Sequence, residues 1–153
     1  MSGLFSDLTE YFHKQMERHR NLPFLKATMG VCALVAIADG TVSLAQRLRM
    51  DQILEGLSVL AVFDPHEGVN LFNDYIESIK ANPEQGRADV LALITKPVEN
   101  DPEAANLLIK VSVAVSSVKA QMSMVEQVEI VSLCTLLGVD PSSVGLYSTD
   151  DLN

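Results

Sequence analysis

The sequence predicts an all-α fold, a single compact bundle of about seven helices, and three observations support that class. Apolar residues recur at helical spacing, and no segment alternates between apolar and polar residues as a half-buried strand does. Asx-Pro dipeptides and Ser-x-x-Gln or Ser-x-x-Glu patterns mark helix starts. With 48% hydrophobic residues, the chain of 153 residues is long enough to bury a core in one domain.

The first predicted helix covers residues 3–20 and is amphipathic. A stripe of large apolar side chains follows one face, formed by Leu4, Phe5, Leu8, Phe12 and Met16. Basic residues gather near the carboxyl end, where the helix dipole favours cations: Lys14, Arg18, His19 and Arg20. We expect residues 1–22 to dock on the rest of the domain. Contact of residues 1–20 with a membrane surface or a partner is the alternative.

The second and third predicted helices, over residues 23–38 and 43–61, meet at a tight turn. The apolar run of the second helix ends at Asp39-Gly40, and a glycine can adopt the left-handed conformation that closes a helix. Ser43 and Gln46 have the spacing of a capping box, in which each side chain bonds the backbone N–H of the other residue. The third helix is therefore predicted to begin there.

Three Asx-Pro dipeptides begin the next helices, which we expect over residues 65–80, 83–95 and 102–118. The dipeptides are Asp64-Pro65, Asn82-Pro83 and Asp101-Pro102. In each, the Asp or Asn side chain can accept bonds from the first backbone N–H groups of a helix. The following Pro has no N–H that would be left unpaired there.

The seventh predicted helix covers residues 123–137. Ser123 with Glu126 repeats the capping pattern at its start, and Gly138 marks its end. Asp140-Pro141 then predicts a short turn over residues 141–146. The sequence thus divides into an amphipathic amino-terminal helix over 1–22, a helical domain over 23–146 and a polar, frayed tail over 147–153.

The helix–turn–helix around residue 40 recurs in altered form 80 residues later, which predicts an internal pseudo-twofold repeat. The helices at 23–38 and 102–118 are the least polar, and we expect them to cross at the centre of the bundle. The helices at 43–61 and 123–137 should cover them. The expected covering residues are Leu48, Met50, Ile53, Leu54, Leu57, Val128, Ile130, Leu133, Leu136 and Leu137.

The composition argues against several classes of function. A net charge of −9 disfavours a nucleic-acid partner, because phosphate binding needs a basic surface. Cys32 and Cys134 lie in apolar runs without CxxC spacing, which indicates buried thiols in preference to a disulfide or a metal pair. The longest apolar stretch is far shorter than the ~20 residues that span a bilayer, and the start of the chain does not have a signal-peptide pattern. We therefore expect a cytoplasmic location, with membrane association as the alternative.

No catalytic motif is evident, so we expect neither enzymatic activity nor a resident cofactor. His66-Glu67 lacks the second His of the HExxH zinc motif, because Asn70 stands at that position. The sequence has no GxSxG motif, no phosphate-binding loop, and no Cys–His pair with an acid to orient it.

An ordered set of features between residues 24 and 146 resembles the TerB-like family. The features are the apolar helix that ends in Ala38-Asp39-Gly40 with its Ser-initiated successor, then Phe63-Asp64, the helix start Pro102-Glu103-Ala104-Ala105, and Leu137-Gly138-Val139-Asp140-Pro141. These are tellurite-resistance proteins related to the amino-terminal domain of a membrane-anchored DnaJ-like cochaperone. The resemblance implies a non-enzymatic module of a tellurite-resistance or stress-response system, which acts as a cytoplasmic adaptor for membrane or stress proteins.

The resemblance also implies a surface for divalent cations, where both repeat turns carry acidic residues. Carried over to this sequence, Asp39 and Glu126 are the acidic residues that remain. Gln46 and Ser123 stand where acids are expected, and Lys119-Ala120 replace Asp-Gly in the second turn. Two carboxylates supply too few oxygens for Ca²⁺ or Mg²⁺, so the metal site is expected to be degenerate.

Lys119 suggests a sharper hypothesis for these turns. If the two turns face each other, its ammonium would lie between Asp39 and Glu126 in place of the cation, and would convert a metal site into a fixed ion pair. The alternative function, a cation- or small-ligand-binding helical sensor, would instead need a polar pocket between the turns.

Overall fold

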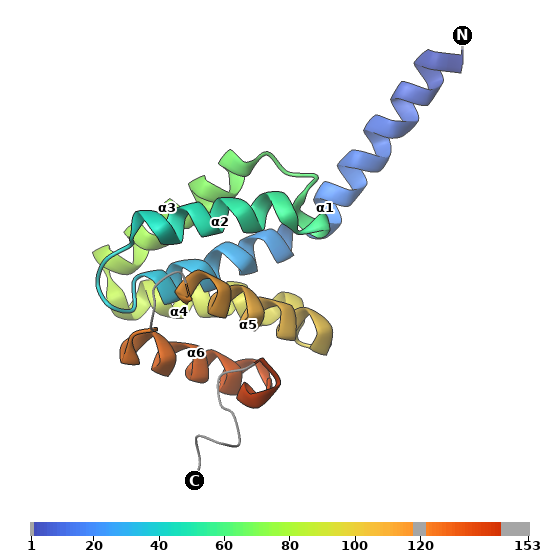
Figure 1. Ribbon diagram of the computed structural model, residues 1–153. Coiled ribbons are helices and arrows are strands. Elements are labelled where there is room, and N and C mark those ends of the chain that lie inside the picture. Colours follow the sequence, from blue (N-terminus) through green and yellow to red (C-terminus); the bar gives the residue numbers. More distant parts are fainter. Residues whose placement is uncertain (1, 118–121, 145–153) are drawn as a thin grey trace.

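The all-α fold class is confirmed by a computed structural model, which describes residues 2–117 and 122–144 (Figure 1). The α-helices are α1 (Ser2–Ala36), α2 (Leu44–Gly56), α3 (Pro65–Ala81), α4 (Pro83–Thr95), α5 (Pro102–Ser116) and α6 (Met124–Leu137). Short 3-10 turns cover Ser58–Leu60, Lys96–Val98 and Pro141–Val144. The described part of the chain therefore has six α-helices where seven were predicted, and the predicted tail at 147–153 lies outside it.

The predicted break between residues 3–20 and 23–38 was wrong, because α1 runs unbroken with Pro23 inside it. A proline in a helix leaves the carbonyl four residues earlier, here that of His19, without an intrahelical partner. His19 and Pro23 are both exposed, so this carbonyl faces the solvent side. The cost of the missing bond is small there, and packing of the following residues keeps the helix continuous.

The predicted helix at 43–61 also ends earlier than expected. α2 stops at Gly56, and Leu57 adopts an extended backbone conformation, with φ −81° and ψ 119°. Glycine is a poor helix former, and its position at the end of α2 agrees with that preference.

The six start signals at Ser43, the Asx-Pro dipeptides and Ser123 are confirmed as helix caps or, for Asp140-Pro141, as the start of a 3-10 turn.

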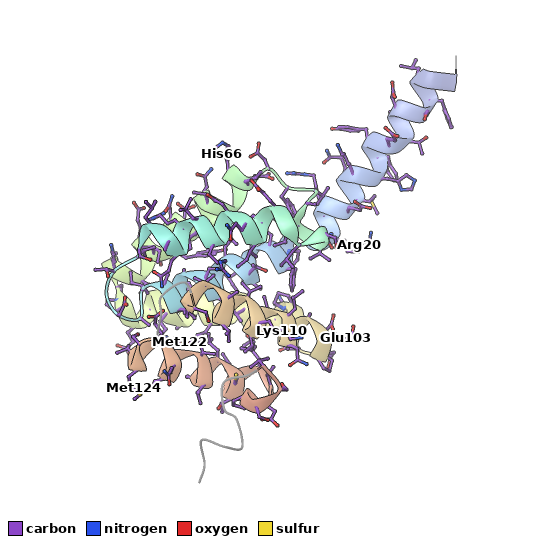
Figure 2. The ribbon with its side chains drawn as sticks, in the orientation of Figure 1. Arg20, His66, Glu103, Lys110, Met122 and Met124 are labelled. Atoms are coloured by element: carbon purple, nitrogen blue, oxygen red, sulfur yellow. The ribbon has the colours of Figure 1, made fainter. Side chains whose placement is uncertain are left out.

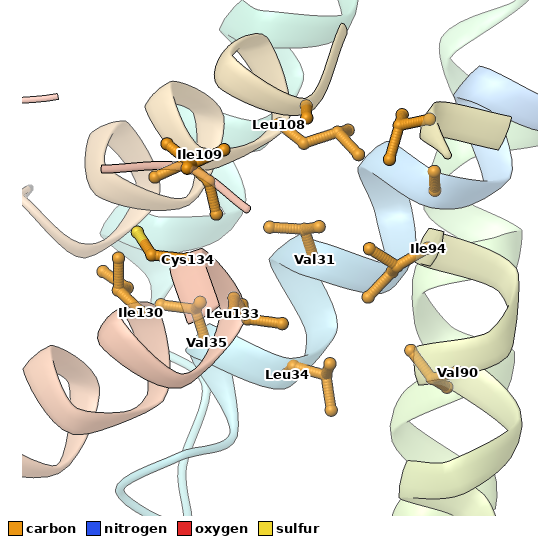
Figure 3. Packing of buried hydrophobic residues seen from close by; sticks show 14 residues of the cluster. Val31, Leu34, Val35, Val90, Ile94, Leu108, Ile109, Ile130, Leu133 and Cys134 are labelled. Atoms are coloured by element: carbon orange, nitrogen blue, oxygen red, sulfur yellow. The ribbon is translucent and has the colours of Figure 1, made fainter. Parts of the chain in front are cut away.

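The second half of α1 lies at the centre of the bundle, where every residue from Ala27 to Ala36 is buried. On one side it packs with α4, α5 and α6, as Figure 3 shows for Val31, Leu34 and Val35 beside Ile94, Ile109 and Leu133. On the other side it packs with α2 and α3 through a second cluster that includes Met50, Leu54, Phe72 and Ile76. Helix α5 also contributes residues to both clusters. The second half of α1 and helix α5 therefore lie at the centre of the bundle, as the sequence predicts.

Three of the predicted covering residues face solvent instead. Leu48 is 54% exposed, Val128 is 62% exposed and Leu136 is 46% exposed. Apolar residues occur on more than one face of α2 and α6, and each helix turns only one of these faces to the core. Met50 and Leu54 in α2, and Ile130 and Leu133 in α6, are the buried residues of those faces.

The expectation that residues 1–22 dock on the domain was wrong for residues 3–17. Figure 1 shows the first half of α1 projecting from the bundle, and residues 3–17 are exposed throughout. Arg18 marks the point where the helix meets the bundle. Its guanidinium donates to Glu67 Oε1 at 2.6 Å and Oε2 at 3.0 Å, and lies 5.2 Å from the centre of the Phe63 ring.

Helices α3 and α4 approach so closely that a side chain at Gly86 would collide with backbone. A Cβ atom there would lie 2.5 Å from Ser78 O and 2.8 Å from the Cα of Ile79. Such contacts cannot be relieved by a side-chain rotation, so the two helices would have to separate. Gly56, at the end of α2, has nothing within 4 Å of the same position.

The Gly86→Ala variant is expected to lose about 1–3 kcal/mol of unfolding free energy, because overpacking forces the backbone of α3 and α4 apart. Urea denaturation measures the loss. Gly56→Ala is the matched control and is expected to be neutral or more stable by up to ~1 kcal/mol, since alanine favours the helix. Equal effects of the two substitutions would contradict the close approach.

The Arg18→Met variant is expected to raise the pKa of Glu67 towards its ordinary value. The hydrogen bond from Arg18 holds the pKa of this carboxyl below that value, so its stabilising effect is present at neutral pH and is lost as pH falls through the lowered pKa. The effect on stability should be small, because the pair is partly exposed and screened by solvent. An NMR titration of the Glu67 carboxyl is the measurement, with Arg20→Met as the control. An unchanged Glu67 titration in Arg18→Met would show that the ion pair does not form.

Candidate functional site

The helix starts of α2 and α6 form the candidate site, and the first of them is a complete capping box. The Ser43 hydroxyl oxygen accepts a hydrogen bond from the backbone N–H of Gln46 at 3.1 Å. In return, the backbone N–H of Ser43 donates to Gln46 Oε1 at 3.0 Å. The capping box predicted from the Ser-x-x-Gln pattern is confirmed.

The start of α6 is capped in a related but different way. The Ser123 hydroxyl oxygen accepts from the backbone N–H of Glu126 at 3.2 Å, as the sequence predicts. The same hydroxyl donates its own hydrogen to Glu126 Oε1 at 2.8 Å. A carboxylate in the first turn of a helix also interacts favourably with the helix dipole. Glu126 is thereby fixed against its own helix start.

The two helix starts meet inside the protein. Gln46 Nε2 donates a hydrogen bond to Glu126 Oε2 at 3.3 Å, across 80 residues of sequence. Gln46 is 1% exposed and Glu126 is 0% exposed. A carboxylate removed from water is costly unless it accepts hydrogen bonds, and here Glu126 Oε1 accepts from Ser123 and Oε2 accepts from Gln46. We call the contact between these two residues the capping junction.

Asp39, the other predicted site residue, lies at the surface in the turn after α1. Its Oδ1 accepts from the backbone N–H of Thr41 at 3.3 Å, which is an Asx turn. Gly40 has the predicted positive φ, at 93°. The structure thus places Asp39 outside and Glu126 inside, while Lys119 lies outside the described residues.

The capping junction does not fit the divalent cation that the family resemblance implies. A hard cation needs six or more oxygen ligands, most of them carboxylate, carbonyl or water. At the junction Gln46 presents an N–H donor towards Glu126, and a donor repels a cation. Among the residues that the structure describes, no three His, Cys, Asp or Glu side chains group closely enough to hold a metal ion.

Both cysteines are buried and free of disulfide bonds, which confirms the interpretation of two buried thiols. Burial raises the pKa of Cys32 to about 12. Burial also raises the pKa of Cys134. Since the thiolate is the reactive form, neither thiol is suited to nucleophilic chemistry at neutral pH.

Sequence reasoning missed the direct contact between Gln46 and Glu126. The signal for it was present, because both residues stand three positions after a capping Ser and are separated by the 80-residue offset of the predicted repeat. What the sequence did not reveal is that both side chains point inward. An exposed side chain is the usual expectation for the residue three positions after a helix cap, since it lies at a helix end.

Over the described residues, none of the helices combines the length and the apolar character that crossing a bilayer requires.

The comparisons with known proteins agree with the resemblance seen in the sequence. Residues 25–147 match the family described as tellurite resistance protein TerB. The tellurium resistance protein TerB of an Alcaligenes species is 29% identical over 113 residues, which cover 74% of this chain and 92% of that protein. No solved structure matches the chain.

The Gln46→Glu variant is expected to lose about 1–3 kcal/mol of unfolding free energy at neutral pH. The substitution removes the N–H donated to Glu126 and puts two buried acids side by side, which raises the pKa of at least one of them. A pKa that is higher in the folded state costs stability as pH rises, so the loss should be greater at about pH 8 than at about pH 5. Urea denaturation at the two pH values measures both effects.

Gln52→Glu is the matched control, because Gln52 is exposed on the same helix and the change in charge is identical. Its expected effect is within about 0.5 kcal/mol at either pH. The capping junction is contradicted if Gln46→Glu is no less stable than this control, or if its loss is greater in acid.

Proposed function

Because the chain belongs to the TerB family, we propose that it is a non-enzymatic module of a tellurite-resistance or stress-response system. In this proposal it acts in the cytoplasm as an adaptor for membrane or stress proteins. The family match begins within the buried half of α1 and continues past α6, so it includes the whole bundle and both helix starts of the capping junction. The association with tellurite resistance rests on this membership.

The capping junction is the observation that carries the adaptor proposal. Its Gln46 amide takes the place of a family acid and donates to Glu126, so a direct hydrogen bond links the two helix starts. A fixed connection of this kind favours a scaffold that presents a constant surface over a sensor that changes on binding a metal. The sensor alternative would require an open polar pocket at this position.

The junction also supports the proposed pseudo-twofold repeat. Residues close to a twofold axis meet their own counterparts, as they do in a symmetric dimer interface. Gln46 and Glu126 are counterparts at the 80-residue offset, and they are in direct contact. Each follows a Ser that caps its helix, so the local structure around them is repeated as well.

Exposed apolar side chains on the outer faces of α2 and α6 offer surfaces for a protein partner. Leu44 is 73% exposed and Met124, labelled in Figure 2, is 72% exposed. Leu48 and Val128 lie one turn further along their helices and are also exposed. Both pairs are separated by 80 residues, so the two helices present equivalent apolar strips that the core does not use. Exposed apolar strips of this kind mark interaction surfaces.

The environments of the two thiols and of the Glu126 carboxylate support the non-enzymatic part of the proposal. Both thiols are buried with raised pKa values. The two oxygens of Glu126 accept bonds from Ser123 and Gln46, which leaves the carboxylate poorly placed to act as a general base.

Growth on tellurite tests the adaptor proposal. In the native host lacking the gene, the wild-type gene should restore growth, and Leu48→Glu with Val128→Glu should restore it less, because charges on the outer strips block a partner. Gln52→Glu, an exposed substitution away from the strips, should complement like the wild type. Full complementation by the double variant, with the protein folded and expressed, would count against the adaptor surface.

Isothermal titration of the full chain with Ca²⁺, Mg²⁺ and Zn²⁺ separates the adaptor from the sensor. The adaptor proposal predicts no saturable heat with any of the three ions, because the donor set at the junction does not suit them. Saturable binding that is lost in Asp39→Asn would favour the sensor alternative.

A further inference from the structure

The projecting half of α1 carries an apolar stripe that the bundle does not cover. The stripe consists of Leu4, Phe5, Leu8, Tyr11, Phe12 and Met16, whose exposed fractions run from 79% at Leu4 to 52% at Met16. These residues fall on one face of the helix, and Ser6, Glu10, His13 and Glu17 fall on the other.

A helix with such a face is unstable by itself in water. Isolated helices of about 12–15 residues are marginal, and most helical stability comes from packing an apolar face. The six side chains expose roughly 100 Å² each, which gives a patch near the upper end of what a monomer normally exposes. The apolar stripe therefore requires an occupant.

An apolar groove continues the stripe where α1 enters the bundle. The groove has a volume of about 860 Å³ and lies between α1, α4 and the turn after α4, with walls formed by Leu22, Pro23, Ala92, Leu93 and Pro97. Leu4 and Leu22 are separated by 18 residues, which is five helical turns, so they lie on the same face of α1. The stripe and the groove form one continuous surface along the helix.

Charge along α1 distinguishes between possible occupants. Residues 2–13 carry two acids, Asp7 and Glu10, and no Lys or Arg. Residues 14–26 carry four bases against one acid: the bases are Lys14, Arg18, Arg20 and Lys26, of which Arg18 is paired with Glu67. The groove itself is lined by two bases, Lys26 and Lys96, and one acid, Asp89. The acidic half of one α1 complements the basic half of another only if the two helices run antiparallel.

The same charges disfavour a membrane as the occupant. Binding of an amphipathic helix to anionic lipids depends on basic residues beside the apolar face. Here most of the apolar stripe lies in the acidic half of the helix, on a chain whose net charge is −9.

We propose that two copies of this chain pair through α1 in antiparallel orientation, each placing its apolar stripe against the stripe and groove of the other. The pairing is isologous, because the same surface serves on both copies. The stripe and groove together approach the roughly 800 Å² per partner that a stable interface needs. The interface lies mostly outside the family match, which begins at residue 25.

Light scattering after gel filtration tests the pairing on the full chain. The wild type should elute at twice the chain mass of 16.6 kDa, with dissociation on dilution. Leu8→Glu in the stripe and Leu93→Glu in the groove should each weaken the dimer at least tenfold. Ser6→Glu, on the opposite face of α1, should leave it intact. A monomeric wild type at every concentration, or equal dimers for Leu8→Glu and Ser6→Glu, would overturn the proposal.

The stripe substitution should not disturb folding, because residues 3–17 do not enter the bundle; a thermal melt of each variant checks this. Orientation is tested with a short bis-maleimide, since the native thiols are buried. A mixture of Leu4→Cys and Leu22→Cys chains should cross-link more than either alone. Cross-linking of Leu4→Cys with itself would show parallel pairing and overturn the proposal, as would sedimentation of a monomeric chain with anionic vesicles.

Discussion

Burial of the second half of α1 is the constraint on which the rest of the structure depends. Apolar residues between Ala27 and Ala36 contribute to each of the two core clusters, and α3, α4, α5 and α6 pack against this helix. A helix that is buried on all sides must be apolar all round. Thr28 is a polar residue in this segment, and its buried hydroxyl donates a hydrogen bond to the Phe24 carbonyl at 2.8 Å. Packing of this segment also explains why Pro23 does not end the helix.

The capping junction adds a buried hydrogen bond to this apolar core. Hydrophobic packing tolerates small shifts of one helix against another, whereas a buried carboxylate loses much of its stabilisation when its donors move. Ser123 and Gln46 hold the two oxygens of Glu126 from the starts of two different helices. We infer that this arrangement fixes the relative position of α2 and α6 in a protein whose proposed task is to present an unchanging surface.

The features that could be predicted from sequence are those determined within a few residues. The caps at Ser43, Asp64 and Ser123 were predictable because donor and acceptor lie within three residues of each other. Exposure of Leu48 and projection of the first half of α1 depend on which faces the other helices leave uncovered. The same holds for the contact of Gln46 with Glu126, since periodicity indicates an apolar face but not what covers it.

The hydrogen bond from Gln46 to Glu126 joins the starts of α2 and α6. NMR of the Gln46 side-chain amide tests it most directly, in EDTA and then with excess Ca²⁺ or Mg²⁺. The amide hydrogens are expected to exchange slowly, and their resonances are expected to stay unchanged when either ion is added. Rapid exchange in EDTA, or a saturable shift of these resonances with either ion, would contradict it.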